Sequence, residues 1–131
     1  MKQSVKLWLE ALRSGKYKQT TGMLHELDDE QGRTIGFCCL GVACEIYIAT
    51  GHKLRRERKA RRVFYEGVSS CLPDDVQNWL GLHDTYGKWA GGDLAAENDS
   101  GASFAEIADL IESNPPGLFV KAAAKRTRVL R

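Results

Sequence analysis

One long, weakly charged segment, residues 34–51, dominates the pattern of hydrophobic and polar positions along the chain. Glu45 is the one charged residue among its eighteen positions, and strongly polar segments flank it on both sides. Residues 34–38 contain the β-branched and aromatic side chains that are typical of a short strand. Over residues 39–50 the apolar side chains follow helical spacing on nearly every side, which predicts a buried helix that ends at Gly51.

Amphipathic spacing predicts three further helices, over residues 4–15, 72–82 and 103–113. The last of these opens with Ser103 and Glu106, which have the spacing of a capping box. Each helix has one apolar stripe, so each is expected to pack one face against a common core.

The remaining pattern predicts strands. Residues 22–27 are expected to pair with residues 34–38 in a β-hairpin, because a polar turn cluster with Gly32 separates the two segments. Residues 63–65 predict a third strand. Residues 83–92 are glycine-rich and predict an irregular segment with a short edge strand.

These elements together predict an α+β fold. We expect a small antiparallel sheet of two to three strands, packed by about four helices around the buried central helix. Residues 1–117 are expected to form a single globular domain and residues 118–131 a basic C-terminal tail. A chain of 131 residues is long enough to bury a core without stabilising cross-links.

Composition narrows the classes of protein that the chain can belong to. It is 43% hydrophobic and 27% charged, as in a globular protein. No apolar run approaches the ~20 residues of a membrane span, and Lys6 and Glu10 interrupt the N-terminal apolar segment, which argues against a signal peptide. We therefore expect a cytoplasmic protein with no membrane partner and reduced cysteines. Adjacent Cys38 and Cys39 do not match paired zinc knuckles, so we expect no metal and no cofactor.

The net charge of +2 conceals a separation of charge along the chain. Residues 53–62 hold seven basic residues and one acid, and residues 121–131 hold five basic residues and no acid. Such segments can neutralise phosphates, so they predict weak nucleic-acid binding as one alternative. The other interpretation is a solvated loop and tail. The candidate contact residues in the first segment are Arg55, Arg56, Arg58, Arg61 and Arg62.

Two adjacent thiols provide a catalytic hypothesis. Cys38 and Cys39 lie at the predicted start of the central helix, and a helix N-terminus lowers the pKa of a thiol. The sequence is therefore compatible with a cysteine-dependent hydrolase or transferase. The alternative is that both thiols are small buried side chains, because free cysteine is among the most buried residue types.

Two loop segments provide candidate binding residues. Asn98 and Asp99 belong to an oxygen-rich segment before a predicted helix, which suits either a polar ligand or a turn that sets up the helix cap. Tyr86 and Trp89 are aromatic residues in the glycine-rich segment, where such side chains often contact partners. A pocket for a nucleotide needs cations and an aromatic ring, and Arg61 and Arg62 together with Tyr86 and Trp89 could supply them.

Four segments carry a resemblance to a known family. They are ALRSGKYKQ (residues 11–19), FCCLGVACE (37–45), LPDDVQNWLGL (72–82) and NDSGASFAEIADLIE (98–112). In these pieces the chain resembles a family of small proteins, without an established activity, that tailed bacteriophages and prophages encode. The resemblance implies an accessory protein in a bacterial host cell, such as an inhibitor of a host enzyme or defence system, or a protein that sequesters a signalling nucleotide. The two basic segments lie outside these pieces.

The leading functional hypothesis is therefore a non-enzymatic phage accessory protein that binds a host protein or a small signalling nucleotide, with a counter-defence role. The cysteine-dependent enzyme and the nucleic-acid-binding protein are the alternatives.

Overall fold

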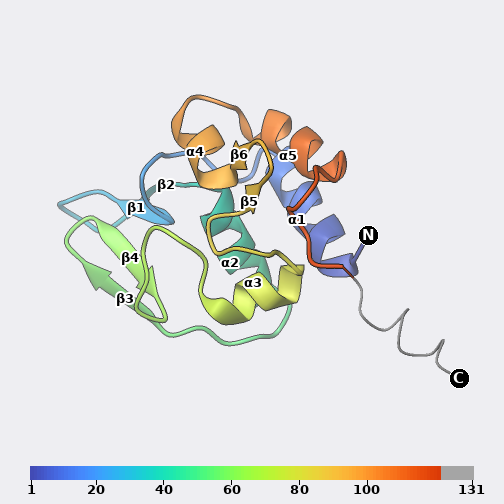
Figure 1. Ribbon diagram of the computed structural model, residues 1–131. Coiled ribbons are helices and arrows are strands. Elements are labelled where there is room, and N and C mark those ends of the chain that lie inside the picture. The colour runs from blue at the N-terminus through green and yellow to red at the C-terminus, as the bar shows by residue number, and fades with distance from the viewer. Residues whose placement is uncertain (122–131) are drawn as a thin grey trace, which may run out of the picture.

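The computed structural model describes residues 1–121, and it has the α+β fold that the sequence predicts. Its main sheet is antiparallel and has the strand order β2-β1-β4-β3, where β1 is His25–Leu27, β2 is Thr34–Phe37, β3 is Arg56–Lys59 and β4 is Arg62–Tyr65. A second, two-stranded sheet pairs β5 (Lys88–Trp89) with β6 (Gly92–Asp93). The helices lie to one side of the main sheet (Figure 1).

Five helices fold within the described residues, one more than the approximate number expected. They are α1 (Gln3–Arg13), α2 (Cys39–Ala49), α3 (Asp74–Leu80), α4 (Leu94–Asp99) and α5 (Phe104–Glu112). The additional helix is α4, whose last three residues belong to the oxygen-rich segment for which a turn is the alternative expectation. The capping box predicted for α5 is present, because Ser103 and Glu106 each bond the other's backbone N–H.

Helix α2 is buried at the centre, as its apolar surface predicts. Seven of its residues are buried, and the indole N–H of Trp8 on α1 donates to the carbonyl of Cys39 over 3.0 Å. Gly41 permits a close approach to the chain before β1, since a Cβ at this position would lie 1.8 Å from the carbonyl oxygen of Leu24. A side chain at position 41 would therefore force α2 and this segment apart.

The main sheet has four strands rather than the expected two or three. The β1–β2 hairpin and strand β4 are confirmed, and the additional strand is β3, which pairs with β4 from Arg56↔Tyr65 to Lys59↔Arg62. All four residues of β3 are exposed, so the segment has no apolar alternation from which a strand could be predicted. The segment is a strand because its backbone pairs with that of β4.

The described contacts continue past residue 117, the expected end of the domain. Leu118 is completely buried, and the backbone N–H of Val120 donates to the carbonyl of Gly81 over 2.8 Å. Most of the predicted basic tail, residues 122–131, lies outside the described residues. In the described part of the chain, no helix is both long and apolar enough to cross a membrane.

Candidate functional site

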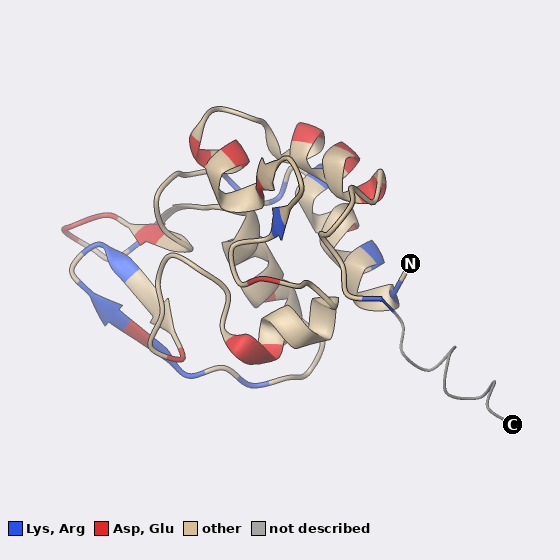
Figure 2. Ribbon diagram, in the orientation of Figure 1, with Lys and Arg blue, Asp and Glu red and all other residues tan. Residues whose placement is uncertain are grey.

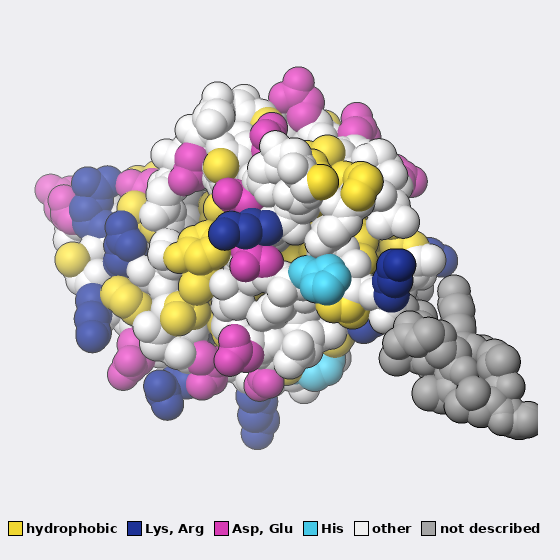
Figure 3. Space-filling model, viewed as in Figure 1, with side chains coloured by type: hydrophobic (Ala, Val, Ile, Leu, Met, Phe, Trp, Pro, Cys, Tyr) yellow, Lys and Arg dark blue, Asp and Glu magenta, His cyan; other side chains and the backbone are white. Residues whose placement is uncertain are grey.

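The β3–β4 hairpin places the basic segment on the surface of the main sheet. Side chains at paired positions share a face, so Arg58 lies on the face of buried Val63, toward α2. Lys59, Arg62 and Phe64 project from the opposite face, which we call the outer face. Figure 2 shows Lys and Arg positions along this hairpin, and Figure 3 shows basic side chains on this side of the molecule, with acidic side chains between them.

The outer face carries a shallow groove of 420 Å³. Its lining combines apolar and basic side chains: Met23, Glu26, Lys59, Ala60, Arg61, Arg62 and Phe64. The ammonium of Lys59 lies 5.2 Å from the centre of the Phe64 ring, and a guanidinium N–H of Arg62 donates to the hydroxyl of Ser69 over 2.9 Å. The groove is therefore lined by an aromatic ring, a thioether and several cations, and one of the cations lies over the ring.

Carboxylates neutralise only part of this basic surface. Arg56 lies 3.5 Å from Glu45, and Arg61 lies 2.8 Å from Glu26. Among residues 1–121, four other cations of the hairpin form no ion pair with a carboxylate: Arg55, Arg58, Lys59 and Arg62. The hairpin consequently presents a net positive charge to solvent, although the chain as a whole carries only +2.

On the face of the main sheet that packs toward α2, a chain of hydrogen bonds ends at Glu45, the single acid of residues 34–51. The hydroxyl of Tyr65 donates to Glu45 over 2.6 Å, so its oxygen must accept from Nδ1 of His25 at 2.9 Å. Nε2 of His25 is then an acceptor for the hydroxyl of Thr34, also at 2.9 Å. Burial lowers the pKa of His25 and raises the pKa of Tyr65, which keeps the imidazole and the phenol neutral between Thr34 and Glu45.

The two candidate catalytic thiols are both buried. Cys39 is completely buried, and its thiol lies 3.6 Å from the carbonyl of Leu94, which it faces as a donor. Burial raises the pKa of the Cys38 thiol to about 11 and moves that of Cys39 in the same direction. Desolvation therefore outweighs the helix N-terminus, and neither thiol has the access or the thiolate character of a nucleophile.

Asn98 is an internal tie instead of a contact residue. Its side-chain oxygen accepts from the backbone N–H of Cys39 and from the amide of Gln19, and its amide donates to the carbonyl of Thr20. It is only 1% exposed, so no ligand reaches it. Asp99 is exposed but accepts from the backbone N–H of Gly22 over 2.9 Å, which joins α4 to the segment before β1.

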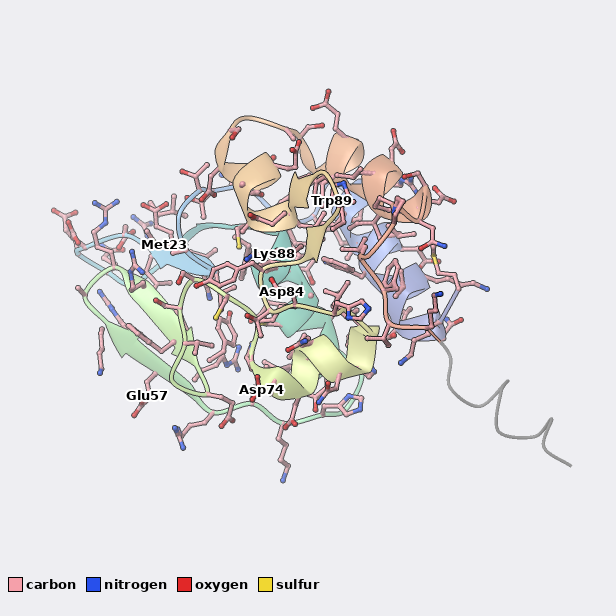
Figure 4. All side chains as sticks on the ribbon, in the orientation of Figure 1. Met23, Glu57, Asp74, Asp84, Lys88 and Trp89 are labelled. Carbon is pink, nitrogen blue, oxygen red and sulfur yellow. The ribbon has the colours of Figure 1, made fainter. Side chains whose placement is uncertain are left out.

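Neither predicted aromatic residue lines the groove of Arg61 and Arg62. Trp89 belongs to β5 and packs beside Gly117, and Figure 4 shows it well apart from Met23. Tyr86 is 40% exposed and lies in the segment before β5. This groove therefore does not bring the four residues together.

The groove uses two residues that the sequence did not single out for binding, Met23 and Phe64. Once β3 and β4 are recognised as a hairpin, the alternation of Arg62, Val63, Phe64 and Tyr65 places Phe64 on the face of Arg62. That signal was present in the sequence. Among residues 1–121, no three His, Cys, Asp or Glu side chains are grouped closely enough to hold a metal ion.

Comparison with known proteins identifies the family of the chain. Residues 1–115 match the model of a family described as a domain of unknown function (DUF8296), so the chain belongs to this family. No curated protein and no solved structure matches it.

Proposed function

We propose that this member of the DUF8296 family is a phage-encoded accessory protein that binds an anionic host factor and thereby inhibits or sequesters it. The observation that carries the proposal is the set of hairpin cations without a carboxylate partner in the described chain: Arg55, Arg58, Lys59 and Arg62. The phage origin and the counter-defence role rest on the sequence resemblance.

Exposed cations that are not neutralised within the protein favour association with an anion for two reasons. They raise the local potential, which accelerates encounter with a negative partner, and they can contact an anion without first breaking an ion pair within the protein. The apolar lining of Met23 and Phe64 adds a surface that can be removed from water on binding. Binding without catalysis suits this surface better than cysteine chemistry, because the candidate thiols are buried.

The test compares two double variants that remove the same charge. Lys59→Gln with Arg62→Gln changes the groove, and Lys16→Gln with Lys18→Gln changes two exposed lysines before β1. Binding of fluorescent oligoglutamate and of a fluorescent single-stranded oligonucleotide is measured by anisotropy at low and physiological salt. We expect the groove variant to lose about tenfold or more in affinity for at least one polyanion, and the control to lose much less.

Two results would contradict the proposal: equal losses in the two double variants, or no measurable binding of either polyanion by the wild type. Arg62 also bonds Ser69, so thermal denaturation must accompany the measurement. If the groove variant is unstable, the double variant Lys59→Gln with Arg62→Lys takes its place. The single variant Arg62→Lys, which keeps Lys59, is expected to bind nearly as well as the wild type, because it retains the positive charge.

A further inference from the structure

The arrangement of charges on the outer face gives the groove a direction. Lys59 and Arg62 are paired across the hairpin next to its turn, and Arg61 lies in the turn itself. The next pair on the same face, two residues farther from the turn along each strand, is Phe64 with Glu57. A phosphate is therefore favoured at the turn end of the groove and disfavoured beside Phe64, where an uncharged group is needed.

A nucleotide unit meets both requirements. Phe64 lies two residues from Arg62 along β4, about 7 Å at the usual rise of a strand, so a phosphate on Arg62 leaves its base within reach of the ring. The bond to Ser69 uses one of the five N–H donors of Arg62, and others remain for phosphate oxygens. Glu26, the carboxylate inside the groove, is already paired with Arg61 at 2.8 Å.

Lys59 occupies the position over Phe64 in the unbound protein. An exposed cation–π contact of this kind contributes about 0.5–1 kcal/mol, whereas a base stacked on an aromatic side chain contributes about 1–3 kcal/mol. A base can therefore displace the ammonium of Lys59, which lies 5.2 Å from the ring centre. The displaced ammonium is then free to contact a phosphate.

We infer that the anionic partner is single-stranded nucleic acid, with one base stacked on Phe64 and the adjoining phosphates on Lys59 and Arg62. This inference rests on the binding proposed above and adds the class of the partner. A duplex keeps its bases stacked within the helix, so it could use the cations but not Phe64. An acidic protein would likewise gain from the cations, without a base to stack on the ring.

The experiment measures anisotropy with four fluorescent probes of equal length: oligothymidylate, its abasic sugar-phosphate counterpart, a DNA duplex and oligoglutamate. The variants are Phe64→Leu, which removes the ring and keeps an apolar side chain, and Phe64→Trp, which keeps an aromatic surface. Tyr86→Leu is the matched control, because it makes the same type of change in an exposed aromatic residue outside the groove. A fourth variant, Glu57→Gln, removes the carboxylate opposite Phe64.

We expect the wild type to prefer oligothymidylate to the abasic probe by about tenfold, the size of one stacked base. Phe64→Leu should abolish this preference without changing the salt dependence, while Phe64→Trp and Tyr86→Leu should retain it. Glu57→Gln should bind oligothymidylate more tightly than the wild type, because a negative charge beside the strand is lost.

Equal affinity of the wild type for oligothymidylate and the abasic probe would overturn the inference. Tighter binding of oligoglutamate than of oligothymidylate would overturn it as well. Both results leave the proposed anionic binding intact, whereas failure of all four probes would overturn the proposed function as well. If Phe64→Leu does not fold, as judged by circular dichroism, the comparison of probes with the wild-type protein decides.

Discussion

His25 illustrates how the position of one residue sets its protonation. It is 9% exposed, stacks on Phe37 at 4.2 Å and is held between Tyr65 and Thr34. Burial lowers its pKa, and the nearby carboxylate of Glu45 opposes this shift without cancelling it. A neutral imidazole consequently joins β1, β2 and β4 in the folded protein.

This state predicts a pH dependence of stability. The folded pKa lies below the ordinary 6.5, so the unfolded chain binds the proton first as the pH falls, and protonation favours unfolding. The contribution is complete above 6.5 and decreases as the pH falls toward the folded pKa. We expect the free energy of unfolding from urea titrations to fall between about pH 7 and pH 5 more steeply in the wild type than in His25→Gln.

His83→Gln is the control for this experiment, because it replaces an exposed histidine. A change of slope that His83→Gln also shows would not be specific to the buried imidazole of His25. If His25→Gln and the wild type have parallel curves, the imidazole does not titrate differently in the folded and unfolded states.

The four cysteines predict a second result at the scale of single residues. Cys38, Cys39 and Cys44 are buried, whereas Cys71 is partly exposed in the groove beside α3. We expect a thiol reagent at neutral pH to label Cys71 in the native protein and the other three only after unfolding, as located by peptide mass spectrometry. Cys71→Ser should remove the native labelling. Labelling of Cys38 or Cys39 as fast as Cys71 would instead support a cysteine-dependent enzyme.

At the scale of elements, Asn98 joins three segments that are distant in sequence. Asn98 lies near the end of α4. Its side-chain oxygen accepts from the first N–H of α2, and its side-chain amide donates to the carbonyl of Thr20 in the chain before β1. An asparagine that satisfies backbone groups in the interior performs the role of a helix cap from another element.

Asn98→Ala is expected to destabilise the fold by about 2–3 kcal/mol, because it leaves the buried N–H of Cys39 and the partly buried carbonyl of Thr20 without their partner. Chemical denaturation measures this loss. Asp99→Ala removes an exposed bond from the N–H of Gly22 and a longer bond from the side-chain amide of Asn98, and it should cost less, about 1 kcal/mol, because it leaves no buried backbone group without a partner. If Asn98→Ala leaves stability unchanged and weakens polyanion binding, Asn98 contacts the ligand and is not a structural tie.

Strand β3 shows where prediction from the sequence reached its limit. Helices α1, α2, α3 and α5 and strand β4 follow from local spacing, and the structure confirms each of them. The basic segment has no such spacing, because an edge strand that is exposed on both faces needs no apolar side chains. Its cations could be nominated from composition, but the pairing with β4, which places Lys59 on the face of Arg62 and Phe64, could not.

At the scale of the whole molecule, residues 118–121 are expected to contribute to the stability of the folded unit. Leu118 is completely buried, and the backbone N–H of His83 donates to its carbonyl over 3.0 Å. We expect a chain that ends at residue 117 to be about 2–5 kcal/mol less stable than one that ends at residue 121, because it loses a buried leucine and these bonds. Thermal and urea denaturation measure the free energy of unfolding of the two truncated chains.

The full-length chain is the reference for both truncated chains. Equal stability of the two truncated chains would support the domain boundary at residue 117 that composition predicts.

The sequence by itself determined the elements whose signals are local: the amphipathic helices, the capping box at Ser103 and the buried helix of residues 39–50. Tertiary structure decided which face of the sheet stays open, which cysteines are buried and which acids neutralise the arginines. It also brought residues 25, 34, 45 and 65 into one hydrogen-bonded chain. The physical reason is that helical and strand periodicity is a property of neighbouring residues, whereas strand pairing and burial depend on contacts between distant segments.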